Sequence, residues 1–295
     1  MSDKIITESF AINLTINEVD FILNSLCKYD VKEAKLFFDS ISPFLISKRK
    51  HLTPENFVSL LYCISKYNLI DVYDMHPLYI EFLFSYETKK FRNEIKQNLP
   101  KILFFLANFT LRTKDFNPLF KEIILLLPQY LKDNSNLSDS FSENLENILL
   151  SLAVVELSMK YDLTNVDFEK YFTAELVGSL LNLYFLKMKN DGNLKRFVEN
   201  FGIEKISYED SNLTVFYNLK YKDDLIPVIL LNNSDYNIDG KFVGSVYIKY
   251  FHLKSYLQNA PMVLNVDKVK TNDDLAKEVS AYWRNRNGAY KTHLI

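Results

Sequence analysis

The sequence predicts an α plus α/β protein, in which a helical N-terminal part precedes a small α/β domain. Apolar residues recur at helical spacing through the first two-thirds of the chain, and a strand–helix–strand pattern follows in the last third. The 295 residues include only six glycines and eight prolines, which is typical of long helices and too few for an all-β fold with many tight turns. A chain of this length can form two domains that each bury a core.

A repeated pattern predicts helices in the first part of the chain. The segments that begin at Leu14 and Leu52 share a Leu-Thr start, apolar residues at helical spacing and a later Lys-Tyr pair. In the second segment, Thr53 is a good N-cap and Pro54 fits the first helical position. Thr15 is expected to cap the first segment in the same way.

The same apolar spacing recurs around Leu103 and Leu149, and a second apolar segment follows each of the four. These second segments span Glu33–Ser47, about 77–86, 116–131 and about 168–187. A helix pair that recurs at about 40 residues indicates an α-solenoid, because neither helix buries its apolar face without its neighbours. We therefore expect an α-solenoid of about four helix pairs. The alternative is an ordinary helical bundle with coincidental periodicity.

The boundary between the two parts is predicted at residues 190–193, Asn-Asp-Gly-Asn, where a long helix is expected to end at the glycine. Residues 1–190 then form the helical-repeat domain. Residues 194–295 form the α/β domain, which includes a basic and aromatic C-terminal segment.

The α/β prediction rests on three consecutive segments. Leu225–Leu231 is a short apolar run that ends at turn-favouring residues, as a buried strand does. Val243–Leu257 has helical spacing, and Pro261 ends that helix before a second strand at Met262–Val266. A strand–helix–strand unit of this kind indicates parallel pairing of its two strands.

At these residues the chain resembles the RAP domain. The resemblance covers about the last third of the chain, and rests on the strand that ends at Leu231, the Val243-Gly244 pair, Lys249 and Leu253 on one helix, and the second strand. This family has a restriction-endonuclease-like core and occurs in organellar RNA-binding proteins, many of them apicomplexan. The preceding helix pairs resemble the heptatricopeptide or octatricopeptide-type repeats that accompany RAP domains.

The positions that carry catalysis in nucleases of this wider fold hold other residues here. Those enzymes bind a divalent metal with an Asp on one strand and a Glu-x-Lys motif on the next. The corresponding places hold Phe216 or Tyr217, and residues 230–232, Leu-Leu-Asn. No Gly-rich phosphate loop and no metal-ligand spacing of the four histidines is present in the sequence. We expect no enzyme, no metal, no cofactor and no small-molecule substrate.

Candidate RNA-binding residues lie in local clusters, because a net charge of −2 makes the chain as a whole a poor attractor of phosphate. The C-terminal cluster interleaves cations with aromatic rings, so that phosphates are held while bases stack. The candidates are Lys48, Arg49, Lys50, Lys195, Arg196, Lys249, Lys254, Trp283, Arg284, Arg286, Tyr290 and Lys291. The alternatives are solvated helix ends that complement the helix dipole, a wet helix face for Lys249 and Lys254, and a disordered C-terminal tail.

Cys27 and Cys63 both lie in apolar helical patterns, which favours reduced, buried thiols over a disulfide or a metal clip. No apolar run approaches the roughly 18 residues that span a bilayer, so we expect no membrane span.

The N-terminal residues lack arginine, unlike a typical mitochondrial presequence. The mitochondrial location that the resemblance implies would then need an internal, very short or removed signal.

The resemblance implies a protein that binds RNA without cutting it. Its most concrete form is a non-catalytic subunit of a mitochondrial ribosome that contacts ribosomal RNA fragments and neighbouring ribosomal proteins. One alternative is a free organellar RNA-processing or RNA-stability factor, and another is a protein–protein scaffold in a different mitochondrial complex. A nuclease is a third, and would need a carboxylate pair beside Lys220 or Lys249.

Overall fold

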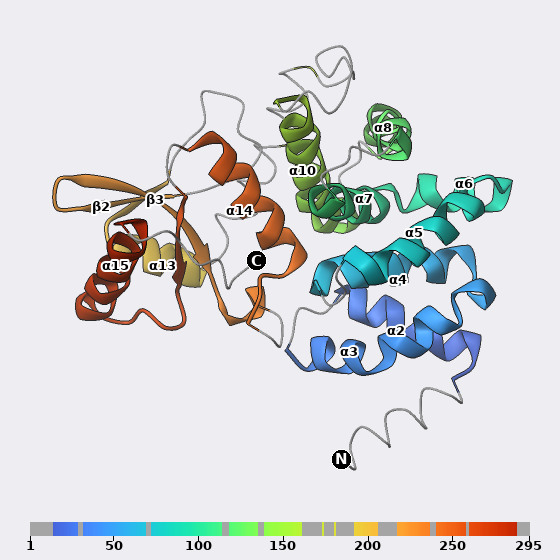
Figure 1. Ribbon diagram of the computed structural model, residues 1–295, viewed down its shortest axis with the longest axis horizontal. Helices are drawn as coiled ribbons and strands as arrows, with labels where there is room; N and C mark the ends of the chain where they lie inside the picture. The colour runs from blue at the N-terminus through green and yellow to red at the C-terminus, as the bar shows by residue number, and fades with distance from the viewer. Residues whose placement is uncertain are drawn as a thin grey trace.

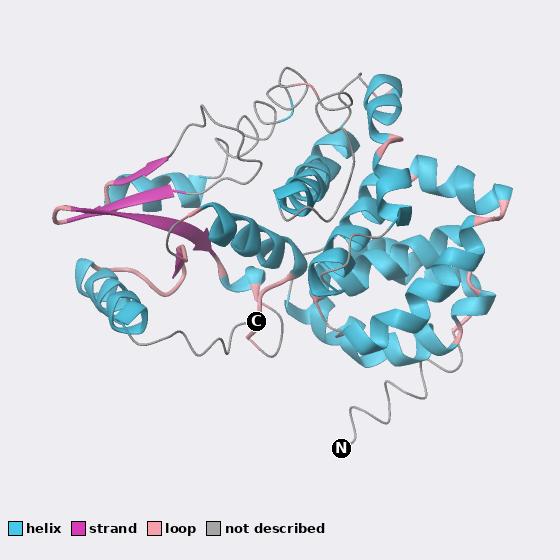
Figure 2. Cartoon of the chain, turned by 45° about the horizontal axis from the view of Figure 1, so that its top comes forward, coloured by secondary structure: helices cyan, strands magenta, loops and turns pink. Residues whose placement is uncertain are grey.

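The computed structural model describes residues 14–28, 32–68, 72–113, 118–134, 139–160, 173, 180, 192–205, 217–236, 240–257 and 260–287. Within these residues the chain is mostly helical, with a small mixed sheet near the C-terminal end (Figure 1, Figure 2). The predicted combination of a helical part and a small α/β part is therefore confirmed. None of the described helices has the length and hydropathy needed to cross a bilayer.

Four helices of the first part pack side by side in chain order. They are α2 (Ile16–Lys28), α4 (Pro54–Tyr67), α7 (Leu99–Thr113) and α10 (Asp139–Lys160). Each packs against the next one along the chain (Figure 1). These are the four helices that the repeated apolar spacing predicts, so the repeat corresponds to a recurring packing position.

The predicted N-caps are present at two of these helices. The side chain of Thr53 accepts a hydrogen bond from the backbone nitrogen of Asn56 at 3.2 Å, and Pro54 begins α4. At α2, the carboxylate of Glu18 accepts a hydrogen bond from the backbone nitrogen of Thr15 at 2.7 Å, while Thr15 Oγ1 accepts one from the nitrogen of Glu18 at 3.4 Å. This reciprocal pair satisfies two amides that the helix itself leaves unbonded.

Further helices occupy the intervals between the four. They are α3 (Lys32–Ser47), α5 (Val72–Tyr86), α6 (Lys89–Gln97), α8 (Pro118–Ile124) and α9 (Leu127–Asp133). The helices predicted at Glu33–Ser47 and about 77–86 are confirmed as α3 and α5. The single helix predicted at 116–131 was wrong: α8 ends at Ile124 and a new helix, α9, begins at Leu127, because Pro128 in its first turn has no amide proton to continue the earlier helix. The segment predicted at about 168–187 lies outside the described residues, apart from Thr173 and Leu180.

The predicted linker at 190–193 is described only at its last two residues. Gly192 and Asn193 belong to the start of helix α13 (Gly192–Asn200), and residues 190 and 191 lie outside the described part of the chain. Phe197 of this helix is buried, and its ring lies 4.7 Å from that of Phe201.

The sheet has the order β1-β2-β3-β4, with strands β1 (Ile203–Lys205), β2 (Tyr217–Tyr221), β3 (Asp224–Leu231) and β4 (Met262–Asn265). The first two pairings are antiparallel, whereas β3 and β4 are parallel, with Val228 opposite Met262. Helix α14 (Gly244–Tyr256) connects β3 to β4, and α15 (Asn272–Asn287) follows β4. The predicted parallel strand–helix–strand unit is confirmed.

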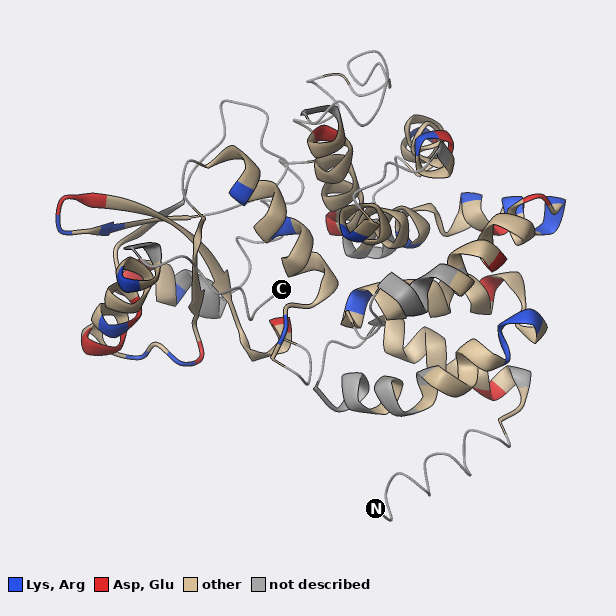
Figure 3. Cartoon of the chain, viewed as in Figure 1, with Lys and Arg blue, Asp and Glu red and all other residues tan. Residues whose placement is uncertain are grey.

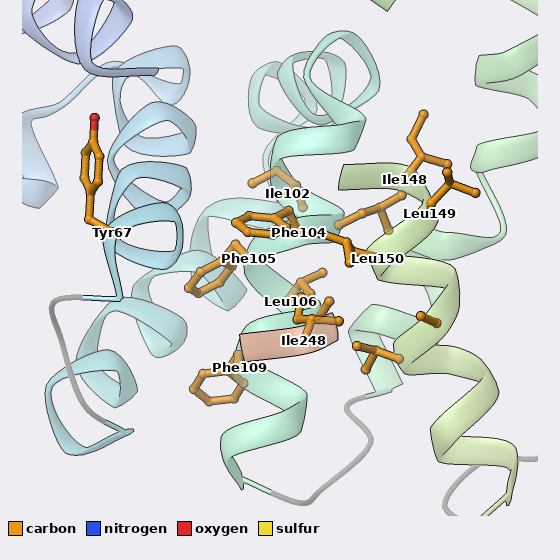
Figure 4. Close-up of a cluster of buried hydrophobic side chains, with 14 of the residues drawn as sticks. Tyr67, Ile102, Phe104, Phe105, Leu106, Phe109, Ile148, Leu149, Leu150 and Ile248 are labelled. Atoms are coloured by element: carbon orange, nitrogen blue, oxygen red, sulfur yellow. The ribbon is translucent and has the colours of Figure 1, made fainter. Parts of the chain in front are cut away.

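Helix α14 joins the sheet to the row of helices. It packs against α10, α7 and α4, next to α10 in Figure 1. Ile248 of α14 is fully buried and belongs to the same apolar cluster as Phe105 of α7 and Leu149 of α10 (Figure 4). That cluster also contains Val228 of the sheet, so one apolar core runs through both parts of the protein.

Candidate nucleic-acid interface

A hollow of about 580 Å³ lies where the row of helices meets the α/β part. Residues of α2, α4, α6, α7, α9 and α10 line it together with residues of the turn after β3 and the start of α14. Polar side chains dominate its lining, and we call it the polar hollow. Its amides are those of Asn24, Gln97, Asn98, Asn134, Asn144 and Asn147.

The end of β3 is shaped by a compact turn. Asn232 Oδ1 accepts a hydrogen bond from the backbone nitrogen of Ser234 at 2.8 Å, and the carboxylate of Asp235 accepts one from the nitrogen of Asn232 at 2.8 Å. Ser234 and Asp235 are thereby held at the wall of the polar hollow. The carboxyl end of a strand in a parallel pair is the place where ligands of open α/β sheets bind.

The start of α14 approaches α4 so closely that only glycine fits. A Cβ atom on Gly244 would lie 2.1 Å from the carbonyl oxygen of Ser65. Beside it, Asn68 Nδ2 donates a hydrogen bond to the carbonyl oxygen of Phe242 at 2.7 Å. This close approach brings Ser245 and the positive end of the α14 dipole to the wall of the polar hollow.

Two lysines supply positive charge to the polar hollow. Lys66 extends from α4, where its Nζ donates a hydrogen bond to the carbonyl oxygen of Cys27 at 3.0 Å, and Lys101 extends from α7. The hollow also contains the carboxylates of Glu146 and Asp235. Glu146 forms an ion pair with Lys249, so it offsets less of the lysine charge. The balance favours a ligand that carries a phosphate.

Aromatic rings lie among the amides of the hollow. The rings of Tyr62 and Phe104 are 5.6 Å apart, and Asn147 Nδ2 donates a hydrogen bond to the hydroxyl of Tyr62 at 3.3 Å. Burial raises the pKa of Tyr130, so its phenol stays a neutral hydrogen-bond donor and acceptor at physiological pH. Phe104 is 1% exposed, so the partly buried rings of Tyr62 and Tyr130, with the amides, are the groups that match the faces and edges of nucleobases.

The carboxylates of the hollow do not form a metal-binding group. Asp235 is engaged by the backbone of the turn after β3, and Glu146 is paired with Lys249. Over the residues that the structure describes, no three His, Cys, Asp or Glu side chains come together in a way that would hold a metal ion. Lys249, which was considered as part of a nuclease site, pairs with the carboxylate of Glu146.

The predicted RNA-binding residues are distributed over separate elements, as Figure 3 shows for lysine and arginine generally. Lys48 is exposed with its Nζ 5.9 Å from the ring centre of Phe44, and Arg49 Nη1 donates to the carbonyl oxygen of Ile46 at 2.9 Å. Lys50 is exposed on the same short 3₁₀ turn, Arg49–His51. Arg196 is exposed on α13, next to Lys195, whose side chain is not described. None of these residues lines the polar hollow.

The two lysines predicted on α14 have different surroundings. Lys249 points to α10 and pairs with Glu146, and its side chain is only 19% exposed. It therefore fits neither a groove open to RNA nor the predicted wet helix face. Lys254 is exposed, with its Nζ 5.9 Å from the ring centre of Tyr250, which agrees with the wet-face alternative.

The C-terminal cluster begins inside a helix. Trp283 and Arg284 belong to α15, where Trp283 packs edge-on against Tyr282 and Arg284 Nε donates to the carbonyl oxygen of Ser280 at 3.3 Å. The alternative of a disordered tail is therefore wrong for these two residues. The side chain of Arg286, and both Tyr290 and Lys291, lie outside the described residues.

The residues of the polar hollow were missed by sequence reasoning. Lys66, Lys101 and the six amides come from six helices or their caps and form no recognised motif along the chain. Asn98 and Asn134 sit at helix C-caps, which is a signal for a helix end and not for a site. Only their convergence on one hollow indicates function.

The chain was also compared with known proteins. It matches no family model, no curated protein and no solved structure.

Proposed function

We propose that this protein is a non-catalytic RNA-binding subunit of a mitochondrial ribosome, and that the polar hollow holds a single-stranded segment of ribosomal RNA. The observation that carries this proposal is the convergence of Lys66 and Lys101 with six side-chain amides and three aromatic side chains in one hollow. The ribosomal and mitochondrial parts of the proposal rest on the resemblance to RAP-domain proteins.

The composition of the hollow suits a nucleotide. The ammonium groups of Lys66 and Lys101 would contact phosphates, and the start of α14 adds its dipole to them. Amides such as Asn98 and Asn144 would pair with base edges, which are accessible only where RNA is single-stranded. A volume of about 580 Å³ accepts a small ligand and is too small for a duplex.

The architecture in the proposal follows from the packing of the elements. We take the row α2, α4, α7 and α10 as the inner layer of an α-solenoid of about four helix pairs, because each of these helices packs against the next. The parallel unit of β3, α14 and β4 supports a RAP-like domain in the C-terminal part. Domain limits of 1–190 and 194–295 remain part of this proposal.

Two residues of the sheet support the proposal that this protein is not catalytic. Tyr217 of β2 and Leu231 of β3 are both buried apolar positions in the places where nucleases of this wider fold carry acidic ligands. A buried aromatic or aliphatic side chain neither binds a metal nor activates water.

A second candidate, a protein–protein scaffold, is favoured by α5. Ile80, Leu83 and Phe84 form an apolar face on this helix, and Phe84 is 71% exposed. Adjacent exposed apolar side chains of this size are typical of surfaces that bind another protein. This face would serve equally in a ribosomal subunit that contacts neighbouring proteins.

Ultraviolet cross-linking of the tagged protein in its native cells, followed by sequencing of the attached RNA, tests the proposal. Discrete fragments of organellar ribosomal RNA are expected. The double variant Lys66→Gln/Lys101→Gln should lose most of the cross-linked RNA, whereas Lys96→Gln on the exposed side of α6 should keep it. Transcripts of many kinds would favour a processing factor, and RNA at background level would leave the scaffold.

A further inference from the structure

Two cysteines on neighbouring helices face each other beside the polar hollow. Cys27 of α2 and Cys63 of α4 both carry free thiols, and their Sγ atoms are 3.7 Å apart. Cys63 is buried, whereas Cys27 is only partly buried and lines the hollow. A small reagent that enters the hollow therefore meets Cys27 first, whereas Cys63 is buried behind it with its sulfur next to that of Cys27.

The two thiols differ in acidity as well as in exposure. The pKa of Cys27 falls from 9.0 to about 7, chiefly because the Cys63 thiol donates a hydrogen bond to it, and the ammonium groups of Lys101 and Lys66 also favour the thiolate. Burial raises the pKa of Cys63 well above its ordinary value. An accessible thiolate next to a protonated buried thiol is the arrangement of a peroxide-reactive cysteine with its resolving partner.

We propose that Cys27 and Cys63 form a peroxide-sensitive dithiol that closes into an intramolecular disulfide between α2 and α4. The oxidant is hydrogen peroxide or another hydroperoxide. The sulfur atoms are 3.7 Å apart, and a disulfide bond is about 2.05 Å long. The two sulfurs therefore need to approach each other by about 1.7 Å. Small rotations of the two side chains and a slight shift of α2 supply this movement.

The chemistry takes two steps. The Cys27 thiolate attacks one peroxide oxygen, so that an S–O bond forms, the O–O bond breaks, and the leaving hydroxide takes up a proton to become water. Cys63 then loses its proton, and its sulfur attacks Cys27, which forms the S–S bond and releases the sulfenic hydroxyl as a second water. Two thiols lose two electrons in total, and one hydrogen peroxide is reduced to two waters.

Mass spectrometry of the full-length protein tests the proposal. The reduced, folded protein is treated with hydrogen peroxide, its remaining thiols are blocked with N-ethylmaleimide in denaturant, and the digest is searched for cross-linked peptides. A peptide pair joined through Cys27 and Cys63, in monomeric protein, is expected. Recovery of both cysteines in the alkylated form, or cross-links between molecules only, would overturn the proposal.

Single-cysteine variants assign the two roles. In Cys63→Ser, peroxide should leave a sulfenic acid on Cys27 that dimedone traps. In Cys27→Ser, oxidation of Cys63 should be at least about tenfold slower, because the buried thiol is neither accessible nor ionised. Equal oxidation rates of the two variants would contradict these assignments, and each variant is first checked for an unchanged circular dichroism spectrum.

The pH dependence of alkylation gives a second readout. The rate at which iodoacetamide modifies Cys27 should reach half of its maximum near pH 7 and level off above about pH 8, because the lowered pKa places the thiolate there. Lys101→Gln should shift this curve to higher pH, and Lys96→Gln should not. A rate that keeps rising through pH 9 in the wild-type protein would contradict the inference. Neither the oxidation assays nor the alkylation assay involves RNA. Their results therefore test the dithiol independently of the proposed function.

Discussion

Gly244 sets how closely the α/β part approaches the helices. The Gly244→Ala variant places a methyl group 2.1 Å from the carbonyl oxygen of Ser65, and backbone atoms must move to admit it. We expect the free energy of unfolding to fall by about 1–3 kcal/mol, measured by urea denaturation. Ser245→Ala at the next position is the control and should change it by less than about 0.5 kcal/mol. An unchanged stability in Gly244→Ala would mean that α14 does not abut α4.

Single lysines of the polar hollow can be tested for their contribution to RNA binding. If Lys101 contacts a phosphate, Lys101→Gln should weaken binding of a single-stranded RNA several-fold and reduce the slope of log K against log salt by about 0.7. Filter binding at several salt concentrations measures both quantities. Lys96→Gln, an exposed lysine outside the hollow, should match the wild-type protein. Equal losses in the two variants would indicate a diffuse charge effect and no site.

At the scale of elements, α14 is held against α10 by more than apolar packing. Lys249 pairs with Glu146 in a partly buried position, and the fully buried His252 lies 2.8 Å from Glu156 through its Nε2. Both pairs join residues about 100 positions apart in the chain. These two polar contacts therefore fix the register of one helix on the other, which apolar side chains alone would specify less sharply.

A double-mutant cycle measures the first of these pairs. Lys249→Ala, Glu146→Ala and the double variant should give a coupling energy of about 1 kcal/mol in urea denaturation, since the two side chains are only 19% and 36% exposed. The matched control is the cycle of Lys277 with Asp274, where the lysine is 79% exposed and the contact is 3.9 Å long. That coupling should be close to zero, and equal values for both cycles would contradict the role assigned to Lys249.

At the scale of the whole molecule, the shared core predicts a single cooperative unfolding transition. Trp283, the one tryptophan of the chain, lies on α15 and reports on the C-terminal part, whereas far-ultraviolet circular dichroism reports mainly on the helices. Both signals should follow the same urea transition, because Ile248 links the helical core to the sheet. Two separated midpoints would show that the parts unfold independently.

A variant at that link makes the prediction sharper. Ile248→Ala removes apolar contacts from a fully buried position and should lower the free energy of unfolding by about 2–5 kcal/mol, with both signals shifted together. The exposed Leu225→Ala on β3 is the control and should have little effect on either signal. If Ile248→Ala moves only the tryptophan signal, the helical row has a core of its own.

The sequence by itself determined the elements whose signals are local. Thr15 and Thr53 marked two helix starts, and the apolar period located α2, α4, α7 and α10. The run from Leu225 to Val266 indicated a parallel strand–helix–strand unit. These signals are readable because caps, helical faces and buried strands depend on neighbours a few residues away. The break between α8 and α9 was missed, because the apolar spacing continues across Pro128.

Tertiary structure decided the candidate site. Lys66 and Lys101 line the same hollow as the turn after β3, Cys63 lies beside Cys27, and Lys249 pairs with Glu146, although no spacing in the chain relates these partners. Helix packing brings them together, and packing is governed by the complementary shapes of whole faces, down to the missing side chain of Gly244. The sequence gives residue types and local periodicity. The proximity of residues that are distant in the chain is a property of the folded protein only.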